Sequence, residues 1–317
     1  MFRRLTSKVR GLLDLPAELR GQTESLRLAV GRIEARQVAA AAPRSLTESE
    51  FQVSSQWGED GIIQHLIRSV PIERRVFVEF GVQDYRESNT RFLLQHDNWS
   101  GLVMDGSARN IEAIRRDAIY WRHNLKAECA FVTRENINSL IEKQGIVGDI
   151  GLLSIDIDGN DYWVWQALEC ISPRIVIVEY NSLFGPAVKV TVPYDPAFVR
   201  GRAHYSNLFW GASLSALCDL AGRKGYVLLG SNSAGNNAFF ARADVASALS
   251  AMSPQQAWVQ ASFRESRDAS GNLTFLSARE AVQVIAHLQV LDIVANRSVT
   301  LHEAMEQTGG YGYWENP

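Results

Sequence analysis

The sequence predicts an α/β protein built on a mostly parallel, seven-stranded sheet that includes one antiparallel strand. Between residues 46 and 245, short apolar runs alternate with segments whose apolar residues recur at helical spacing. This alternation is typical of a parallel sheet covered by helices on both faces. The last two apolar runs are separated only by the turn-rich run SNSAGNN, which favours a hairpin and hence one antiparallel strand.

The strands and helices of this domain can be placed in order. We expect strands over seven apolar runs, 76–80, 101–105, 128–132, 151–156, 175–180, 226–230 and 237–241. We expect helices over the intervening segments, 58–69, 88–96, 108–117, 135–143, 161–170 and 211–224. The carboxyl ends of the parallel strands would then share one edge, which is where open α/β sheets bind ligands.

Residues 1–45 are predicted to form an N-terminal helical arm and linker. Leu19, Leu26 and Ile33 recur every seven residues, as in a coiled coil, and Pro16 is expected to interrupt the helix. Two interpretations are equally consistent with this pattern: packing on the arm's own domain, and self-association into a homo-oligomer. Peripheral membrane contact is a further interpretation, because the arm begins with a short basic amphipathic stretch.

Composition excludes several classes of protein. A hydrophobic fraction of 46% supports a sizeable core, and a net charge of −3 argues against a nucleic-acid partner. We expect neither a membrane span nor a secretory signal. The three cysteines lack metal or redox spacing and are expected to be buried thiols of a cytoplasmic protein. Residues 246–317 are expected to form a C-terminal helical extension.

The first acidic strand end lies in VFVEFGVQDYRESNT. Glu79 is followed by Gly81, which lets a ligand approach the backbone, and Asp105 ends the next strand at a spacing that suits ribose hydroxyls. A single glycine, in place of GxGxxG, does not favour a diphosphate. The ligand that fits best is therefore S-adenosylmethionine, whose amino-acid end Gln56 in SSQWGEDGI can contact. The alternative is that Glu79 only caps the following helix.

A second acidic cluster follows the next two strands of the predicted sheet. Asp156, Asp158 and Asp161 lie within six positions, and Glu179 and Asn181 end the following strand. Buried anions this close need a cation, a proton or solvent. Oxygen ligands from neighbouring strand ends suit Mg²⁺ or Mn²⁺, with Asp158, Glu179 and Asn181 as predicted ligands. Helix N-capping and solvation explain the aspartates equally well.

His204 is the candidate general base, because it lies in the polar stretch GRAHYSN and histidine titrates near neutral pH. An ordinary histidine of a surface loop is the alternative. Asp158 and Asp161 are the other predicted catalytic residues, since either carboxylate can take the acceptor proton when no metal binds.

Five segments together resemble the FkbM-like class I S-adenosylmethionine-dependent methyltransferases: SQWGEDGI, VFVEFGVQDYRESNT, LVMDGS, LLSIDIDGNDYWVWQAL and IVIVEYN. The resemblance covers roughly residues 50–245 and implies a Rossmann-like methyltransferase sheet. It implies acids at the fourth and fifth strand ends that bind Mg²⁺, although Tyr180 stands where some relatives carry a second acid. The cofactor-binding residues expected from the resemblance and the strand-end argument are Gln56, Glu79, Gly81, Asp105, Ala130, Phe131 and Asp156.

The function implied is methyl transfer from S-adenosylmethionine to a hydroxyl of a sugar or glycan-type acceptor, with assistance by Mg²⁺ or Mn²⁺. Two other hypotheses stay open. One is a non-catalytic scaffold that keeps the fold and acts through its helical arm. The other is a different nucleotide-cofactor α/β enzyme, such as a nicotinamide-dependent one, against which the missing phosphate loop counts.

Overall fold

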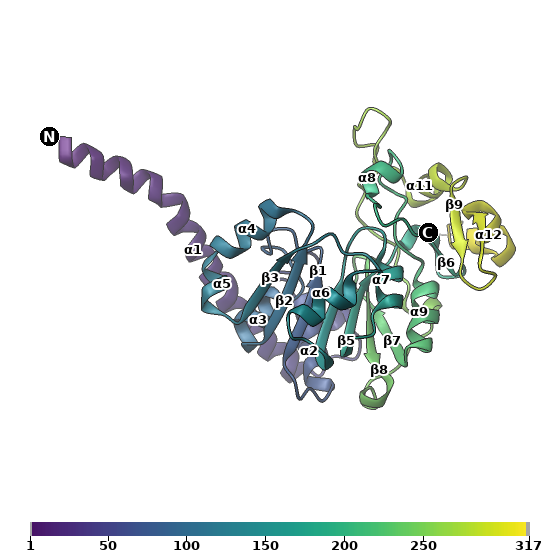
Figure 1. Cartoon of the computed structure of the whole chain (residues 1–317), viewed down its shortest axis with the longest axis horizontal. Helices are drawn as coiled ribbons and strands as arrows, with labels where there is room; N and C mark the ends of the chain where they lie inside the picture. Colours follow the sequence, from purple (N-terminus) through teal and green to yellow (C-terminus); the bar gives the residue numbers. More distant parts are fainter. Residues whose placement is uncertain (1, 315–317) are drawn as a thin grey trace.

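A computed structural model describes residues 2–314, with the side chains of Leu19 and of residues 21–314. Its main sheet has the strand order β3-β2-β1-β4-β5-β8-β7 (Figure 1). The strands are β1 Val76–Phe80, β2 Ser100–Asp105, β3 Leu125–Cys129, β4 Gly148–Ile155, β5 Ile171–Glu179, β7 Tyr226–Ser231 and β8 Asn237–Arg242. β8 runs antiparallel to both neighbours and the other pairs are parallel. The predicted Rossmann-like, seven-stranded fold class is confirmed.

Helices cover both faces of this sheet. Those of the sheet domain are α2 Glu59–Ser69, α3 Arg91–Asp97, α4 Ala108–Arg116, α5 Ala118–Arg122, α6 Ile137–Lys143, α7 Asp161–Ala167, α8 Arg200–Ala203 and α9 Leu214–Arg223. Short 3₁₀ turns are η1 Thr47–Ser49, η2 Ser182–Phe184 and η3 Ala243–Val245. One face buries Trp165 and Phe240, and the other buries Phe77 and Trp99, so the strands are apolar on both sides.

β3 lies three residues earlier than the sequence predicts. Asp105 pairs with Cys129, so β3 ends level with β2 and leaves Ala130 and Phe131 just beyond the sheet edge. Lys126 and Glu128 interrupt the apolar run of this strand, so sequence analysis places its start too late. The expectation of buried cysteines is also wrong here, because Cys129 is exposed.

The N-terminal arm is one continuous helix, α1 Phe2–Ala41, which extends away from the sheet (Figure 1). The predicted interruption at Pro16 is therefore wrong at the level of the backbone. The arm packs on the body at Gly31, where a Cβ atom would lie 2.4 Å from Val53. An ion pair of 2.6 Å joins Glu24 to Arg91. Within the described residues, no helix combines the length and hydrophobicity needed to cross a bilayer.

The C-terminal region is less helical than its sequence suggests. It contains α10 Pro254–Ala257, α11 Ala278–Ile285, α12 Leu301–Thr308 and η4 Gly310–Trp314. The strands β9 Gln289–Asp292 and β10 Arg297–Thr300 join β6 Val190–Thr191 in a separate antiparallel sheet. Sequence analysis missed β9 because its apolar residues continue the helical pattern of α11. Residues 258–277, which we call the strap, form neither helix nor strand beyond an isolated bridge.

Candidate active site

Glu79 anchors the loop that follows β1. Only 4% of Glu79 is exposed, and its carboxylate accepts hydrogen bonds from Ser88 Oγ (2.7 Å), Asn89 N (2.9 Å) and both the backbone and hydroxyl of Thr90. Burial raises the pKa of Glu79, and the hydrogen bonds from Thr90 and Ser88 oppose that rise. Both carboxylate oxygens thus hold the loop. The predicted contact with a cofactor stays a prediction.

Gly81 is required by the close approach of this loop to β4. Its φ is 74°, and a Cβ atom there would lie 1.7 Å from the carbonyl oxygen of Asp156. Gln83 and Tyr85 also have left-handed φ values, 48° and 63°, which are unfavourable for residues with side chains. Strained backbone of this kind persists only where surrounding contacts hold it and is concentrated at functional sites. Here Asp105 accepts a hydrogen bond from Gln83 N, and the hydroxyl of Tyr85 bonds that of Thr90, each at 2.9 Å.

Asp105 lies between this loop and the start of α4. Its Oδ2 accepts a hydrogen bond from Gln83 N (2.9 Å), and its Oδ1 accepts from Ser107 N (2.8 Å) and Asn110 Nδ2 (3.0 Å). Asp105 is 9% exposed, and its contact with Gln83 places it within reach of a ligand that lies on the loop after β1. The structure brings Glu79 and Asp105 together on adjacent strand ends.

Ala130 and Phe131 border the same part of the edge. Ala130 N donates to the carbonyl oxygen of Asp105 at 3.0 Å. Phe131 is 49% exposed, and a Cβ atom on Gly106 would lie 3.4 Å from its ring. An exposed aromatic face beside a carboxylate matches the adenine and ribose of a nucleoside.

Gln56 lies on a neighbouring loop that is fixed by Asp60. The Oδ2 atom of Asp60 accepts the backbone N–H groups of residues 53–55 at 2.7–2.8 Å. Ser88 N donates to Ser54 O at 3.0 Å, which ties this loop to the one after β1. Gln56 is exposed. Burial raises the pKa of Asp60 to about 6.

A carboxylate cluster occupies the carboxyl ends of β4 and β5. One oxygen from each of Asp156, Asp158 and Glu179 lies within 4.8 Å of the others. Glu179 is 6% exposed, and its Oε2 has no hydrogen-bond partner within the described residues. Burial, followed by repulsion from the neighbouring aspartates, raises the pKa of Asp156 and Glu179 well above the ordinary range. The cluster therefore favours binding of protons or cations.

Asp161 and Asn181 are held by other contacts. Asp161 accepts hydrogen bonds from Ile157 N and Gly159 N, each at 2.9 Å, and burial raises its pKa to about 6. Asn181 Nδ2 donates to two carbonyl oxygens, at residues 208 and 210, while its Oδ1 accepts a backbone N–H. The third member of the carboxylate cluster is therefore Asp156, in place of the predicted Asn181, whose amide is used to hold the main chain.

The contacts of His204 are with residues outside the carboxylate cluster. Its Nδ1 lies 2.7 Å from Ser206 Oγ, and its ring packs against Tyr205 and His287. Burial lowers the pKa of His204, and the charge of His287 adds to that effect. Within the described part of the chain, no contact joins His204 to the carboxylate cluster.

Arg200 is the residue that sequence analysis missed. Its guanidinium bonds Asp158 at 2.9 Å, forms an ion pair with Glu265 of the strap, and lies 4.6 Å from the ring centre of Trp210. It supplies the cation that partly neutralises the cluster. No local pattern announces this role, because Glu265 is distant in sequence.

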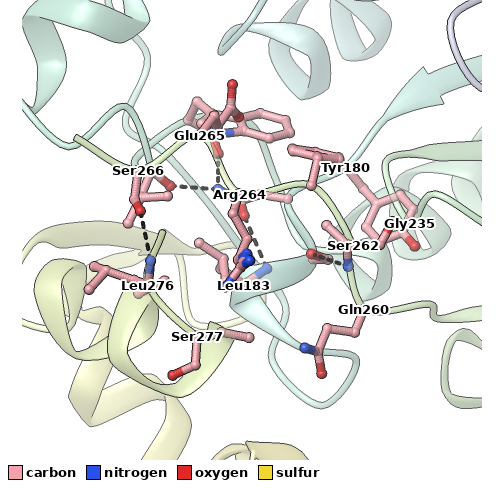
Figure 2. Close-up of a pocket in the computed structure, with 18 residues that line it drawn as sticks. Tyr180, Leu183, Gly235, Gln260, Ser262, Arg264, Glu265, Ser266, Leu276 and Ser277 are labelled. Carbon is pink, nitrogen blue, oxygen red and sulfur yellow. Dashed lines mark hydrogen bonds between the residues drawn. The ribbon is translucent and has the colours of Figure 1, made fainter. Parts of the chain in front are cut away.

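A cavity of about 240 Å³ lies beside this ion pair, beyond the end of β5 (Figure 2). Its walls come from residues 180–183, residues 208–210, the strap and the start of α11. Leu183, Trp210 and Phe263 give it apolar and aromatic surface, and Glu265 is at its border with Arg200. The strap thus forms one wall of a cavity whose other walls belong to the sheet domain and to α11.

No family model matches this sequence, and neither does any curated protein. Among solved structures, similar chains include the N-terminal domain of EvdMO1 with S-adenosylhomocysteine bound (10% identity, 67% of this chain and 96% of that chain, TM-score 0.39). A second is the Bacillus cereus O-methyltransferase with S-adenosylhomocysteine (16% identity, 67% of this chain and 89% of that chain, TM-score 0.37). A third is the CurJ carbon methyltransferase (10% identity, 58% of this chain and 52% of that chain, TM-score 0.38). These likenesses are too distant to establish a family or an activity.

Proposed function

We propose that this protein transfers a methyl group from S-adenosylmethionine to a hydroxyl of a sugar or glycan-type acceptor. The observation that carries the proposal is the place of Asp105 in the sheet. It ends β2, one strand away from a single-glycine loop after β1, in the order β3-β2-β1-β4-β5-β8-β7. That arrangement suits a ribose whose nucleoside carries no phosphate.

The loop after β1 supports a phosphate-free ligand. In dinucleotide sites, backbone N–H groups at this position bind the pyrophosphate. Here the N–H groups of Asn89 and Thr90 donate to Glu79, so they are not directed at a ligand. In the proposed complex, Asp105 accepts the ribose hydroxyls, and Phe131 covers the adenine. S-adenosylmethionine supplies the reactive methyl group when bound.

The acceptor is proposed to occupy the cavity beyond β5. An aromatic wall at Trp210 and Phe263 suits the carbon face of a sugar ring. The cavity volume of about 240 Å³ suits a single sugar unit. A carboxylate of the cluster accepts the proton of the acceptor hydroxyl, and the oxygen forms a bond to the methyl carbon. The carbon–sulfur bond breaks with its electron pair on sulfur, which leaves the neutral thioether. Asp158 stays a predicted catalytic residue, whereas Asp161 and His204 are held elsewhere.

The cluster also fits a divalent cation, which we include in the proposal. The carboxylates of Asp156, Asp158 and Glu179 come from two neighbouring strand ends and converge, and Glu179 keeps a buried oxygen without a partner. Oxygen donors in this number suit Mg²⁺ or Mn²⁺, which would orient an acceptor hydroxyl and lower its pKa.

Calorimetry with S-adenosylhomocysteine tests the cofactor assignment. We expect the wild-type protein to bind, and Asp105→Ala to weaken the affinity about 10- to 100-fold because charged hydrogen bonds to the ribose are lost. Glu112→Ala removes an exposed carboxylate from the adjacent helix α4 and should leave the affinity unchanged. Absence of binding to the wild-type protein would refute the proposal and favour the scaffold hypothesis. A rise in melting temperature with NAD would favour the nicotinamide-dependent alternative.

A further inference from the structure

Helix α1 carries two stripes on opposite sides. The inward stripe, which packs on the body, consists of Leu28, Gly31, Ala35 and Val38. The outward stripe consists of Leu19, Leu26, Val30 and Ile33, which are 52%, 67%, 54% and 47% exposed. With 3.6 residues per turn, the centres of the two stripes lie roughly 150° apart around the helix. The body therefore leaves an apolar stripe uncovered along α1.

This outward stripe belongs to a longer heptad pattern in the sequence. Leucine or isoleucine recurs at every seventh position, at Leu5, Leu12, Leu19, Leu26 and Ile33. The positions four residues after Leu5 and Leu26 are Val9 and Val30. A strict seven-residue repeat drifts by about 20° per heptad around a straight helix, so it fits a second helix that supercoils with the first. Leucine occupies four of the five d positions, and valine occupies two of the five a positions, Val9 and Val30, which favours two parallel strands. The other a positions are Pro16, Thr23 and Gln37.

The length of α1 limits the area that a partner helix can bury. The 40 residues of α1 give a length of about 60 Å. A contact strip about 10 Å wide would bury on the order of 600 Å² on each helix, near the lower limit for a stable interface. A shorter partner would cover too little. The N-terminal part of α1 extends away from the sheet (Figure 1).

We propose that α1 pairs with α1 of a second copy of this chain, in a parallel, in-register, two-stranded coiled coil. The same residues then meet across a two-fold axis, and every copy brings the complementary stripe. In this register, Ala29 lies next to Glu34 of the partner subunit, so this flanking pair brings no like charges together. Pro16, at an a position, removes one helix hydrogen bond without interrupting the helix. The inference is independent of the proposed methyl transfer.

Light scattering of the 317-residue chain as it elutes from a size-exclusion column, at micromolar concentration, tests the dimer. We expect twice the monomer mass for the wild type and the monomer mass for the double variant Leu26→Lys, Val30→Lys. The variant should keep the circular dichroism of a folded body, because both side chains lie on the stripe that the body leaves uncovered. Its melting temperature should no longer rise with protein concentration, as that of a dimer does. Ser25→Lys, at an exposed position outside the stripe, is the matched control and should stay dimeric. A monomeric wild type overturns the proposal.

Disulfide cross-linking tests the register. In a Cys129→Ser background, oxidised Leu26→Cys should form an intermolecular disulfide, because Leu26 faces Leu26 of the partner subunit. Ser25→Cys should not form one. A dimer in which Leu26→Cys stays unlinked would overturn the parallel, in-register arrangement. A wild type that is monomeric and floats with phosphatidylserine-containing vesicles would assign the stripe to a membrane surface and overturn the proposal.

Discussion

The two acidic parts of the sheet edge differ in how their carboxylates are neutralised. At β1, four donors from one loop surround Glu79, so the charge is spread over hydrogen bonds within the fold. At β4 and β5, Asp156 and Glu179 face each other, and the nearest cation, Arg200, bonds Asp158. A satisfied carboxylate fixes a loop, whereas carboxylates that repel one another keep a capacity to bind. We therefore infer that the carboxylate at β1 positions the loop after that strand, and that the carboxylates at β4 and β5 are the ones that bind protons or cations.

The sharpest way to break this comparison is to remove Glu79. In Glu79→Ala, the buried donors of Ser88, Asn89 and Thr90 lose their acceptor. We expect the free energy of unfolding to fall by about 4 kcal/mol, since each unsatisfied buried donor costs about 1–3 kcal/mol and the losses overlap. Urea denaturation measures this change. Glu87→Ala, an exposed carboxylate of the same loop, should change stability by less than about 0.5 kcal/mol.

A loss below about 1 kcal/mol in Glu79→Ala would show that Glu79 does not anchor the loop. It would then become a candidate for direct contact with the cofactor, as the sequence predicts.

Arg200→Met, at the carboxylate cluster, should lower the free energy of unfolding by less than Glu79→Ala does. Methionine keeps a side chain over Trp210 but removes the cation between Asp158 and Glu265. We expect a loss of about 2 kcal/mol near pH 8, because both acid partners are partly exposed and water replaces some of the interaction. Urea denaturation near pH 5 should give a smaller loss, since protonated carboxyls repel less. Arg202→Met, exposed on the same helix, is the control.

The smallest expected effect comes from the pH dependence of Glu179. Burial raises its pKa, so above the ordinary pKa of a glutamate the folded protein binds more protons than the unfolded chain. Stability should therefore fall as the pH rises from about 5 to about 8. Glu179→Gln should flatten this dependence and stabilise the protein by about 1 kcal/mol near pH 8, whereas Glu87→Gln should not.

Magnesium binding can be tested by comparing the melting temperatures of the wild type and Glu179→Gln. Near pH 8, MgCl₂ should raise the melting temperature of the wild type and leave Glu179→Gln unchanged, because a ligand that binds the folded state stabilises it. An equal rise in both proteins would mean that the cation binds elsewhere.

The sequence predicted the sheet well because its strands are continuous apolar runs with abrupt ends. It placed β1 at its observed bounds and expected the hairpin of β7 and β8. It missed the position of β3, whose charged residues break the apolar run. At the site, it grouped the acids of β4 and β5 by strand alternation. The contact of Arg200 with Glu265, and the cavity that the strap lines, depend on tertiary packing between distant segments and leave no local pattern.

The place of β8 in the sheet has a consequence for synthesis of the chain. β8 lies between β5 and β7, so β5 keeps an unpaired edge until residues 237–242 have left the ribosome. Ile171–Glu179 is almost wholly buried in the finished protein, and an exposed apolar edge of that length recruits other strands. Chains that stop before residue 237 should therefore aggregate rather than accumulate as a smaller folded domain.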